Sequence, residues 1–343
     1  MATTSGSRTG DFCSVVVAGG YGINLLPLTV SDPKYLLSVG NYPLIYYSLR
    51  SLEDAGFCDT LLVTRGQWLQ EIQEAVENLK MKIKCEYLVL PDQYESNTAS
   101  VLFWIKPKLK CEDILVLSGD VYGDVEIKAM AATYRKRNAS LCMYAQRHPE
   151  DMGYDLLECG VHPSSITKIP DDPNNICEYL AFDPKDDKLL LCEYDTDISE
   201  TISIPRRLYR KYMILFIRHP DFKICHKVLD LHLYMLKRSV VNLITPQSLL
   251  DYKSDLVCYL LNKQFLEENK PVPPQLFENE EDTPFTPGNH RLNKDSKYTC
   301  VQNADLYPSD ELIRCFVHFS TGQSLCLRVN NAPVLYISNM MVF

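Results

Sequence analysis

The sequence lacks the features that would assign it to a membrane, to the secretory pathway or to a nucleic acid. No stretch approaches the roughly 18 apolar residues that a membrane-spanning helix needs. The first 12 residues lack the apolar centre of a signal peptide. A net charge of −9 argues against a general phosphate-backbone binder. We therefore expect a cytosolic protein that contacts neither a membrane nor nucleic acid directly.

The cysteines indicate neither a disulfide-stabilised fold nor a metal site. There are 13 of them, an odd number, and no two have Cys-x-x-Cys spacing, so neither a zinc site nor a set of disulfides is indicated. The one basic cluster, at 206–211, is typical of a solvated face. Apolar residues (46%) and charged residues (23%) occur at ordinary globular levels, and a length of 343 residues favours more than one unit.

Short apolar runs alternate with helical periodicity along the first half of the chain. Runs rich in Val, Leu and Ile predict buried strands at 15–18, 60–64, 87–90, 114–118 and 141–145. An aromatic and aliphatic stripe with glutamates around it predicts a helix at 67–80. This alternation predicts an α/β fold with a Rossmann-like, doubly wound, mostly parallel sheet over residues 11–266, which would bind ligands at the carboxyl ends of its strands.

The first predicted strand runs into a glycine turn at Gly19, Gly20 and Gly22. Glycine lets backbone amides turn toward anionic oxygens, although the same residues would also serve a simple strand-to-helix turn. The apolar residues 25–29 and the pair Pro33-Lys34 make the pattern more specific, and the whole segment resembles the signature of sugar-nucleotide pyrophosphorylases. This resemblance implies a nucleotidyltransferase fold.

The loop departs from that signature at a catalytic position. The family reads G-x-G-T-R-L, whereas this chain has Asn24 in place of the arginine. Asparagine donates hydrogen bonds but carries no charge, and loss of one preorganised donor costs roughly 10²–10³ in rate. Lys34 is retained, so we expect a weakened nucleotide loop.

A second motif ends the predicted strand 114–118 with Gly119 and Asp120. The resemblance implies that this aspartate would hold a divalent metal, and oxygen ligands suit magnesium. A structural Gly-Asp turn is the alternative that we favour. The family's second carboxylate lies in or near an N-x-G-x-Y segment, and the matching stretch, 230–234, keeps only Tyr234. We expect neither a metal nor another cofactor.

Two further segments of the family are incomplete. Its base-reading segment, Q-x-x-x-x-G-T-A, is one residue shorter here and lacks the glycine at 93–99, and its E-K-P segment is missing between Asp120 and Asp230. We therefore expect no catalytic residues. The predicted remnant of the nucleotide pocket consists of Gly19, Gly20, Gly22, Asn24, Lys34, Asn97 and Asp120.

Over about residues 12–265 the chain resembles one group in particular, the gamma subunits of eukaryotic translation initiation factor 2B. The resemblance is carried by Pro33-Lys34 and by the segments 36–45, 116–120, 230–234 and 259–265. It implies a non-catalytic cytosolic subunit that pairs with the epsilon subunit and other subunits of this guanine-nucleotide exchange factor, and that acts indirectly on initiation factor 2. An active pyrophosphorylase of the mannose-1-phosphate guanylyltransferase type and a non-catalytic sugar-nucleotide-binding regulatory subunit remain alternatives.

The last part of the chain is divided by composition. A proline-rich acidic linker is expected at 267–297, followed by a short C-terminal segment at 298–343. The resemblance implies a β-helix of hexapeptide repeats at this place, and no such repeat is found in 298–343. Alternation at 312–319 and 324–329 predicts short strands or an extended tail.

Overall fold

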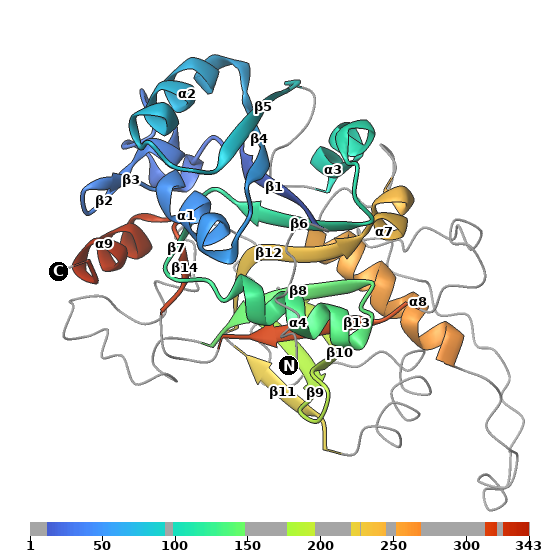
Figure 1. Cartoon of the computed structure of the whole chain (residues 1–343). Coiled ribbons are helices and arrows are strands. Elements are labelled where there is room, and N and C mark those ends of the chain that lie inside the picture. The colour runs from blue at the N-terminus through green and yellow to red at the C-terminus, as the bar shows by residue number, and fades with distance from the viewer. Residues whose placement is uncertain are drawn as a thin grey trace, which may run out of the picture.

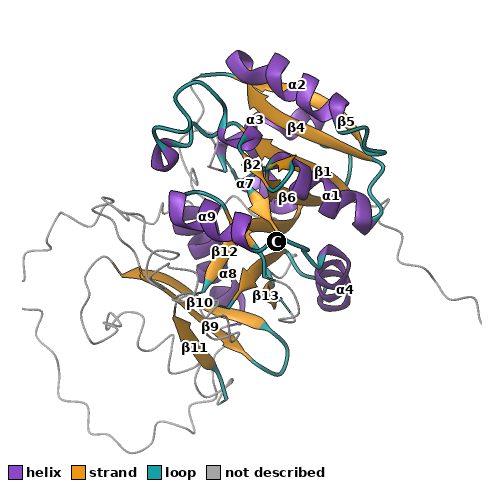
Figure 2. Cartoon of the chain, turned by 90° about the vertical axis from the view of Figure 1, so that its left-hand side faces the viewer, coloured by secondary structure: helices purple, strands orange, loops and turns teal. Residues whose placement is uncertain are grey.

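A computed structural model describes residues 12–92, 99–147, 177–195, 221–226, 228–244, 252–268, 313–320 and 325–342. Its centre is a ten-stranded sheet in the order β11-β9-β10-β13-β8-β12-β6-β1-β4-β5. Figure 2 shows the strands following one another from β5 at the top to β11 at the bottom. No helix of the described part is long and apolar enough to cross a membrane.

The four strands at the β5 edge of the sheet are parallel to one another. They are β1 (Phe12–Ala18), β4 (Asp59–Arg65), β5 (Lys84–Leu90) and β6 (Asp113–Ser118), with β1 between β4 and β6. Next to β6 lies the antiparallel β12 (Leu229–Lys237), followed by β8 (Leu141–Gln146). All five predicted strands are therefore confirmed.

The remaining four strands are mixed in direction. Strands β9 (Cys177–Asp183), β10 (Lys188–Asp195) and β11 (Lys223–His226) are antiparallel to their neighbours. Strand β13 (Cys315–Phe319) is parallel to β8 on one side and antiparallel to β10 on the other. Short ladders are formed by β2 (Ser38–Val39) with β3 (Tyr42–Pro43) and by β7 (Val121–Tyr122) with β14 (Leu327–Arg328).

Helices cover both faces of the sheet, as the Rossmann-like α/β prediction requires. One apolar core holds side chains of α1 (Ile45–Ala55), α2 (Leu69–Asn78) and α4 (Ile127–Arg137). The other holds side chains of α3 (Ser100–Ile105), α7 (Arg238–Leu243) and α8 (Cys258–Glu268), with a π-helical turn at Tyr252–Val257. Alternation assigns Val15 and Val17 to the second core and Val16 to the first. The helix predicted at 67–80 is α2, preceded by a 3-10 turn at Gly66–Trp68.

The C-terminal segment belongs to the same body. Figure 1 shows β13 inside the sheet, β14 beside β7, and the last helix, α9 (Ala332–Met340), close to β2. The expected boundary at residue 266 thus separates stretches of chain that the structure packs into one sheet. The linker expected at 267–297 lies outside the described residues beyond the end of α8.

Candidate functional site

The glycine turn after β1 is held by hydrogen bonds to other parts of the chain. The backbone N–H of Gly20 donates to the hydroxyl of Tyr35 over 2.8 Å, and the carbonyl of Gly19 accepts from Nε of Arg65 over 2.8 Å. Gly22 has φ +69°, and a Cβ there would lie 2.9 Å from Cβ of Lys34. The turn is therefore closed down onto the Lys34–Leu36 3-10 turn.

Lys34 is buried at the start of that turn. Its Nζ donates a hydrogen bond to Oδ2 of Asp120 and forms an ion pair with it. Burial lowers the pKa of Lys34 from its ordinary value, because loss of solvent and repulsion from Arg328 outweigh the attraction of Asp120. The ammonium group therefore depends on this carboxylate for its charge.

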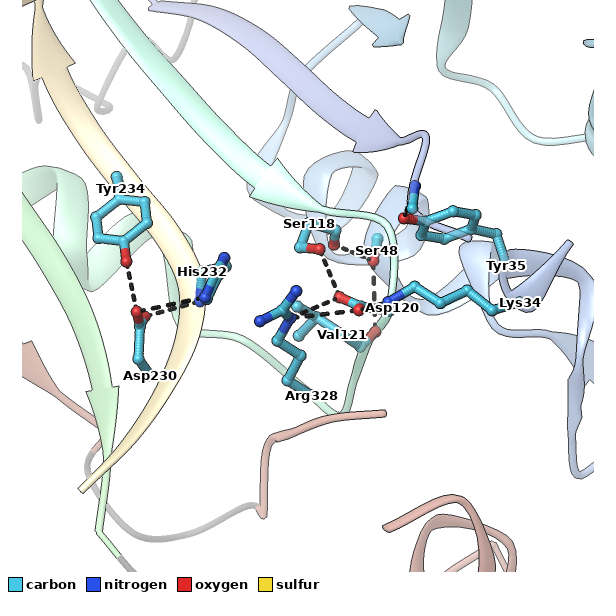
Figure 3. A network of polar contacts seen from close by, with 11 residues as sticks. Lys34, Tyr35, Ser48, Ser118, Asp120, Val121, Asp230, His232, Tyr234 and Arg328 are labelled. Atoms are coloured by element: carbon cyan, nitrogen blue, oxygen red, sulfur yellow. Dashed lines mark hydrogen bonds and ion pairs between the residues drawn. The ribbon is translucent and has the colours of Figure 1, made fainter. Parts of the chain in front are cut away.

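Asp120 follows strand β6 and has no exposed surface. Its Oδ1 accepts from the hydroxyl of Ser118, and Nε of Arg328 lies 3.3 Å from both carboxylate oxygens (Figure 3). Burial alone would raise the pKa of Asp120, but Arg328 and then Lys34 outweigh this and hold the pKa well below its usual range. The carboxylate is thus ionised at neutral pH and fully buried.

An ionised carboxylate offers about four lone-pair positions. At Asp120 these are taken by Ser118 on Oδ1, Lys34 on Oδ2 and Arg328 on both oxygens. Among the described residues, no group of three or more His, Cys, Asp or Glu side chains could hold a metal ion. The residues around Asp120 therefore do not fit the divalent metal that the pyrophosphorylase signature implies.

Asp230 was the sequence match for the segment of the second metal carboxylate, and the structure turns it toward its own strand. Its carboxylate accepts from the backbone N–H of His232 over 2.8 Å and from the hydroxyl of Tyr234. His232 has φ +50°, and the pairing of β12 with β8 shifts register between Asp230 and Tyr234. In Figure 3 the guanidinium of Arg328 lies between Asp120 and the side chains of β12.

Sequence reasoning missed Arg328. The alternation at 324–329 predicted a strand there, but nothing in that pattern shows which residue the strand brings to Asp120. Pairing of β14 with β7 sets Arg328 opposite Val121, next in sequence to Asp120. The backbone N–H of Val329 also donates to the carbonyl of Asp120 over 2.8 Å.

The residues of the predicted nucleotide pocket are only partly brought together. Gly20, Lys34 and Asp120 meet around Tyr35, whose ring is the nearest neighbour of a Cβ built at Gly119. Asn24 is exposed on the Ile23–Leu25 3-10 turn, and Asn97 lies outside the described residues. The structure thus brings together only part of the predicted pocket.

The outer surface of the same loop is apolar. No residue from 19 to 30 is charged, and large side chains are exposed at Tyr21, Ile23, Leu26, Leu28 and Val30. The guanidinium of Arg65 lies 4.2 Å from the ring centre of Tyr21, so the tyrosine covers this cation. Apart from Asn24, the side chains that this loop exposes are thus mainly large and apolar, whereas Thr29 is buried.

Both the sequence and the fold of the chain are similar to those of nucleotidyltransferases. Residues 13–175 match the family model described as nucleotidyl transferase. A solved structure, a putative glucose-1-phosphate thymidylyltransferase from Bacillus anthracis, is similar in fold with a TM-score of 0.57 at 12% identity, over 96% of this chain and 94% of that one.

More specific similarity is to the translation initiation factor eIF2B subunit gamma. The chain is 26% identical to that of Dictyostelium discoideum over 333 residues (89% of this chain, 68% of the relative) and 23% identical to that of Schizosaccharomyces pombe over 342 residues (97% and 65%). It thus spans about two thirds of the length of these relatives. The resemblance to gamma subunits expected from the sequence is confirmed.

A mannose-1-phosphate guanyltransferase from Debaryomyces hansenii is 30% identical over 169 residues, which cover 46% of this chain and 44% of that protein. Similarity to the gamma subunits therefore extends over about twice as much of the chain as similarity to this transferase.

Proposed function

We propose that the chain is a non-catalytic subunit of an eIF2B-type guanine-nucleotide exchange complex, in which it pairs with the epsilon subunit and promotes GDP release from initiation factor 2 indirectly. The observation that carries the non-catalytic part is the closed state of Asp120. A nucleotidyl transfer needs cations directed at phosphate oxygens, and here the buried Lys34 and the largely buried Arg328 are directed at a carboxylate of the chain itself.

Similarity to gamma subunits over 89% and 97% of the chain supports the complex. The apolar loop supports a role in assembly, because contiguous exposed apolar side chains are typical of contacts between proteins. An uncharged surface is also a poor docking site for a triphosphate. We therefore propose that residues 21–30 take part in the contact with the epsilon subunit.

The complex is tested by tagging the chain and recovering its partners from native cytosol at moderate salt. We expect the epsilon subunit in the eluate, and added purified chain should raise epsilon-dependent GDP release. Ile23→Asp should weaken both results. Ile224→Asp is the matched control, because Ile224 is a similarly apolar exposed side chain on β11, at the other end of the sheet. Absence of the epsilon subunit together with unchanged GDP release would refute the assignment.

Catalysis is tested separately by mass spectrometry of the chain with pairs of nucleoside triphosphates and sugar phosphates. We expect no product above buffer. Turnover of any pair would restore the pyrophosphorylase alternative, and equilibrium binding of GDP-mannose without turnover would favour the regulatory binder. Asn24→Arg alone should not create activity, because groups that act as a unit are strongly non-additive.

A further inference from the structure

The cluster around Asp120 has the charge pattern of an ion-binding site with the ion replaced by side chains. Two positive groups, Lys34 and Arg328, face one fully buried carboxylate, and the carboxylate of Asp230 acts on Arg328 from the other side. Two positive charges between two carboxylates are also what a bound divalent cation would supply. Here both charges come from the chain itself.

Strand β14 delivers the second of these charges from far away in the sequence. Arg328 and Asp120 are 208 residues apart, and the β14–β7 ladder aligns Leu327 with Tyr122. The close approach depends on Gly123, which has φ +108° and whose Cβ would lie 2.4 Å from the carbonyl oxygen of Leu325. The backbone here is shaped to admit the C-terminal segment.

Both sides of β14 are anchored. Before and within the strand, Leu325 and Leu327 are buried, and after it Val329 is buried, all in an apolar cluster with residues of β2 and α9. Helix α9 is capped by Asn331, whose Oδ1 accepts from the N–H of Val334 over 2.9 Å. At its end, Oδ1 of Asn339 accepts from the N–H of Gly40 over 3.0 Å. Arg328 is therefore held in place independently of its ion pair.

We propose that Arg328 is an internal replacement for a divalent cation and that the segment 325–342 is a built-in plug, which closes Asp120 to divalent ions. The proposal concerns Asp120 and its neighbours only and does not depend on the proposed partner. It requires that the chain bind no divalent ion at Asp120 while Arg328 is in place. Removing the guanidinium should free lone pairs of Asp120 and leave uncompensated negative charge, which a small oxygen-seeking cation can satisfy.

The test is titration of the whole chain with Mn²⁺ alone, followed by electron paramagnetic resonance of the free ion and by calorimetry. Wild type should show no binding that depends on Asp120. Arg328→Ser should gain a site at least tenfold tighter than any in wild type, and adding Asp120→Asn should abolish it. Arg328→Lys should gain none, because it keeps the charge. Arg314→Ser is the matched control, because Arg314 is an arginine just before β13 and outside the segment 325–342, and it should behave as wild type.

Circular dichroism establishes that each variant is folded, and Arg328→Gln is titrated in place of Arg328→Ser if the serine variant is not. The proposal is overturned if Arg328→Ser or Arg328→Gln folds and gains no Mn²⁺ site. It is also overturned if wild type binds Mn²⁺ at a site that Asp120→Asn removes. If neither uncharged variant folds while Arg328→Lys does, a positive charge is required here, which supports the proposal. Failure of Arg328→Lys to fold as well would overturn it in favour of a packing role.

Discussion

Neutralising Asp120 should strongly destabilise the chain. In Asp120→Asn the shape is kept, but Lys34 and Arg328 lose the fully buried carboxylate that both face. Removing one partner of a buried ion pair costs about 3–5 kcal/mol. Because the pKa of Lys34 is already lowered by burial, we expect this lysine to lose its proton in the variant. That relief should keep the cost near the lower end, at about 3 kcal/mol.

The assay is urea unfolding followed by the fluorescence of the two tryptophans, Trp68 and Trp104. Lys34→Met added to Asp120→Asn should recover part of the loss, since it removes a buried amine that has lost its carboxylate partner, and neighbouring sites couple by about 0.5–3 kcal/mol. Arg50→Ala is the control. It breaks the Arg50–Asp54 pair on α1, whose side chains are about half exposed, and should leave the unfolding midpoint unchanged.

Acid provides a second measurement on the same variants. The pKa of Asp120 is held below its usual range in the folded state, so its contribution is complete above the ordinary aspartate pKa of 3.8 and is lost as pH falls toward the folded value. Wild type should therefore lose stability below about pH 4 more steeply than Asp120→Asn. The reasoning is refuted if Asp120→Asn costs no more than Arg50→Ala and the acid limbs coincide.

Three other measurements probe the same architecture. Gly123→Ala should cost at least about 1–3 kcal/mol in urea unfolding, because of its φ of +108° and the 2.4 Å approach to Leu325, and a neutral result would contradict the tight turn. Burial lowers the pKa of His318 below its ordinary 6.5 despite Glu126, so the folded state disfavours the protonated imidazole. The free energy of unfolding should therefore decrease as the pH is lowered below about 6.5, and His318→Asn should make this decrease less steep. A protease site engineered near residue 285 should yield two pieces that co-elute until denaturant is added, since β13 lies between β8 and β10, and earlier separation would count against this packing.

The elements that could be predicted are those marked by a local pattern of apolar residues in the sequence. Runs such as 15–18 and 114–118 are apolar on both faces because helices cover both sides of the sheet, and each is recognisable within a few residues. The helix at 67–80 was equally visible, since Ile72 and Val76 share one buried face. Both depend on neighbours in sequence.

The placement of the C-terminal strands was not predictable for the converse reason. Residues 315–319 alternate like many short strands, and nothing in them specifies insertion between β8 and β10. Arg328 is a single charged residue in a short stretch. It reaches Asp120 only because β14 pairs with β7, which the local sequence does not specify. The orientation of the Asp230 carboxylate toward Tyr234 was not predictable either, because the register shift between Asp230 and Tyr234 depends on the pairing of β12 with β8.

Burial of Asp120 at the end of β6 creates a need that the rest of the chain must meet. A fully buried carboxylate without a positive partner would be protonated or would destabilise the fold. A bound cation would meet the need from solution and would remain exchangeable. Arg328 supplies the positive charge as part of the chain itself. Its ion pair with Asp120 therefore links strand β14 to the turn that follows β6. The arginine that takes the place of a bound cation occupies lone pairs of Asp120, which are then not available to bind a metal. The same contact makes the C-terminal segment an integral part of the domain.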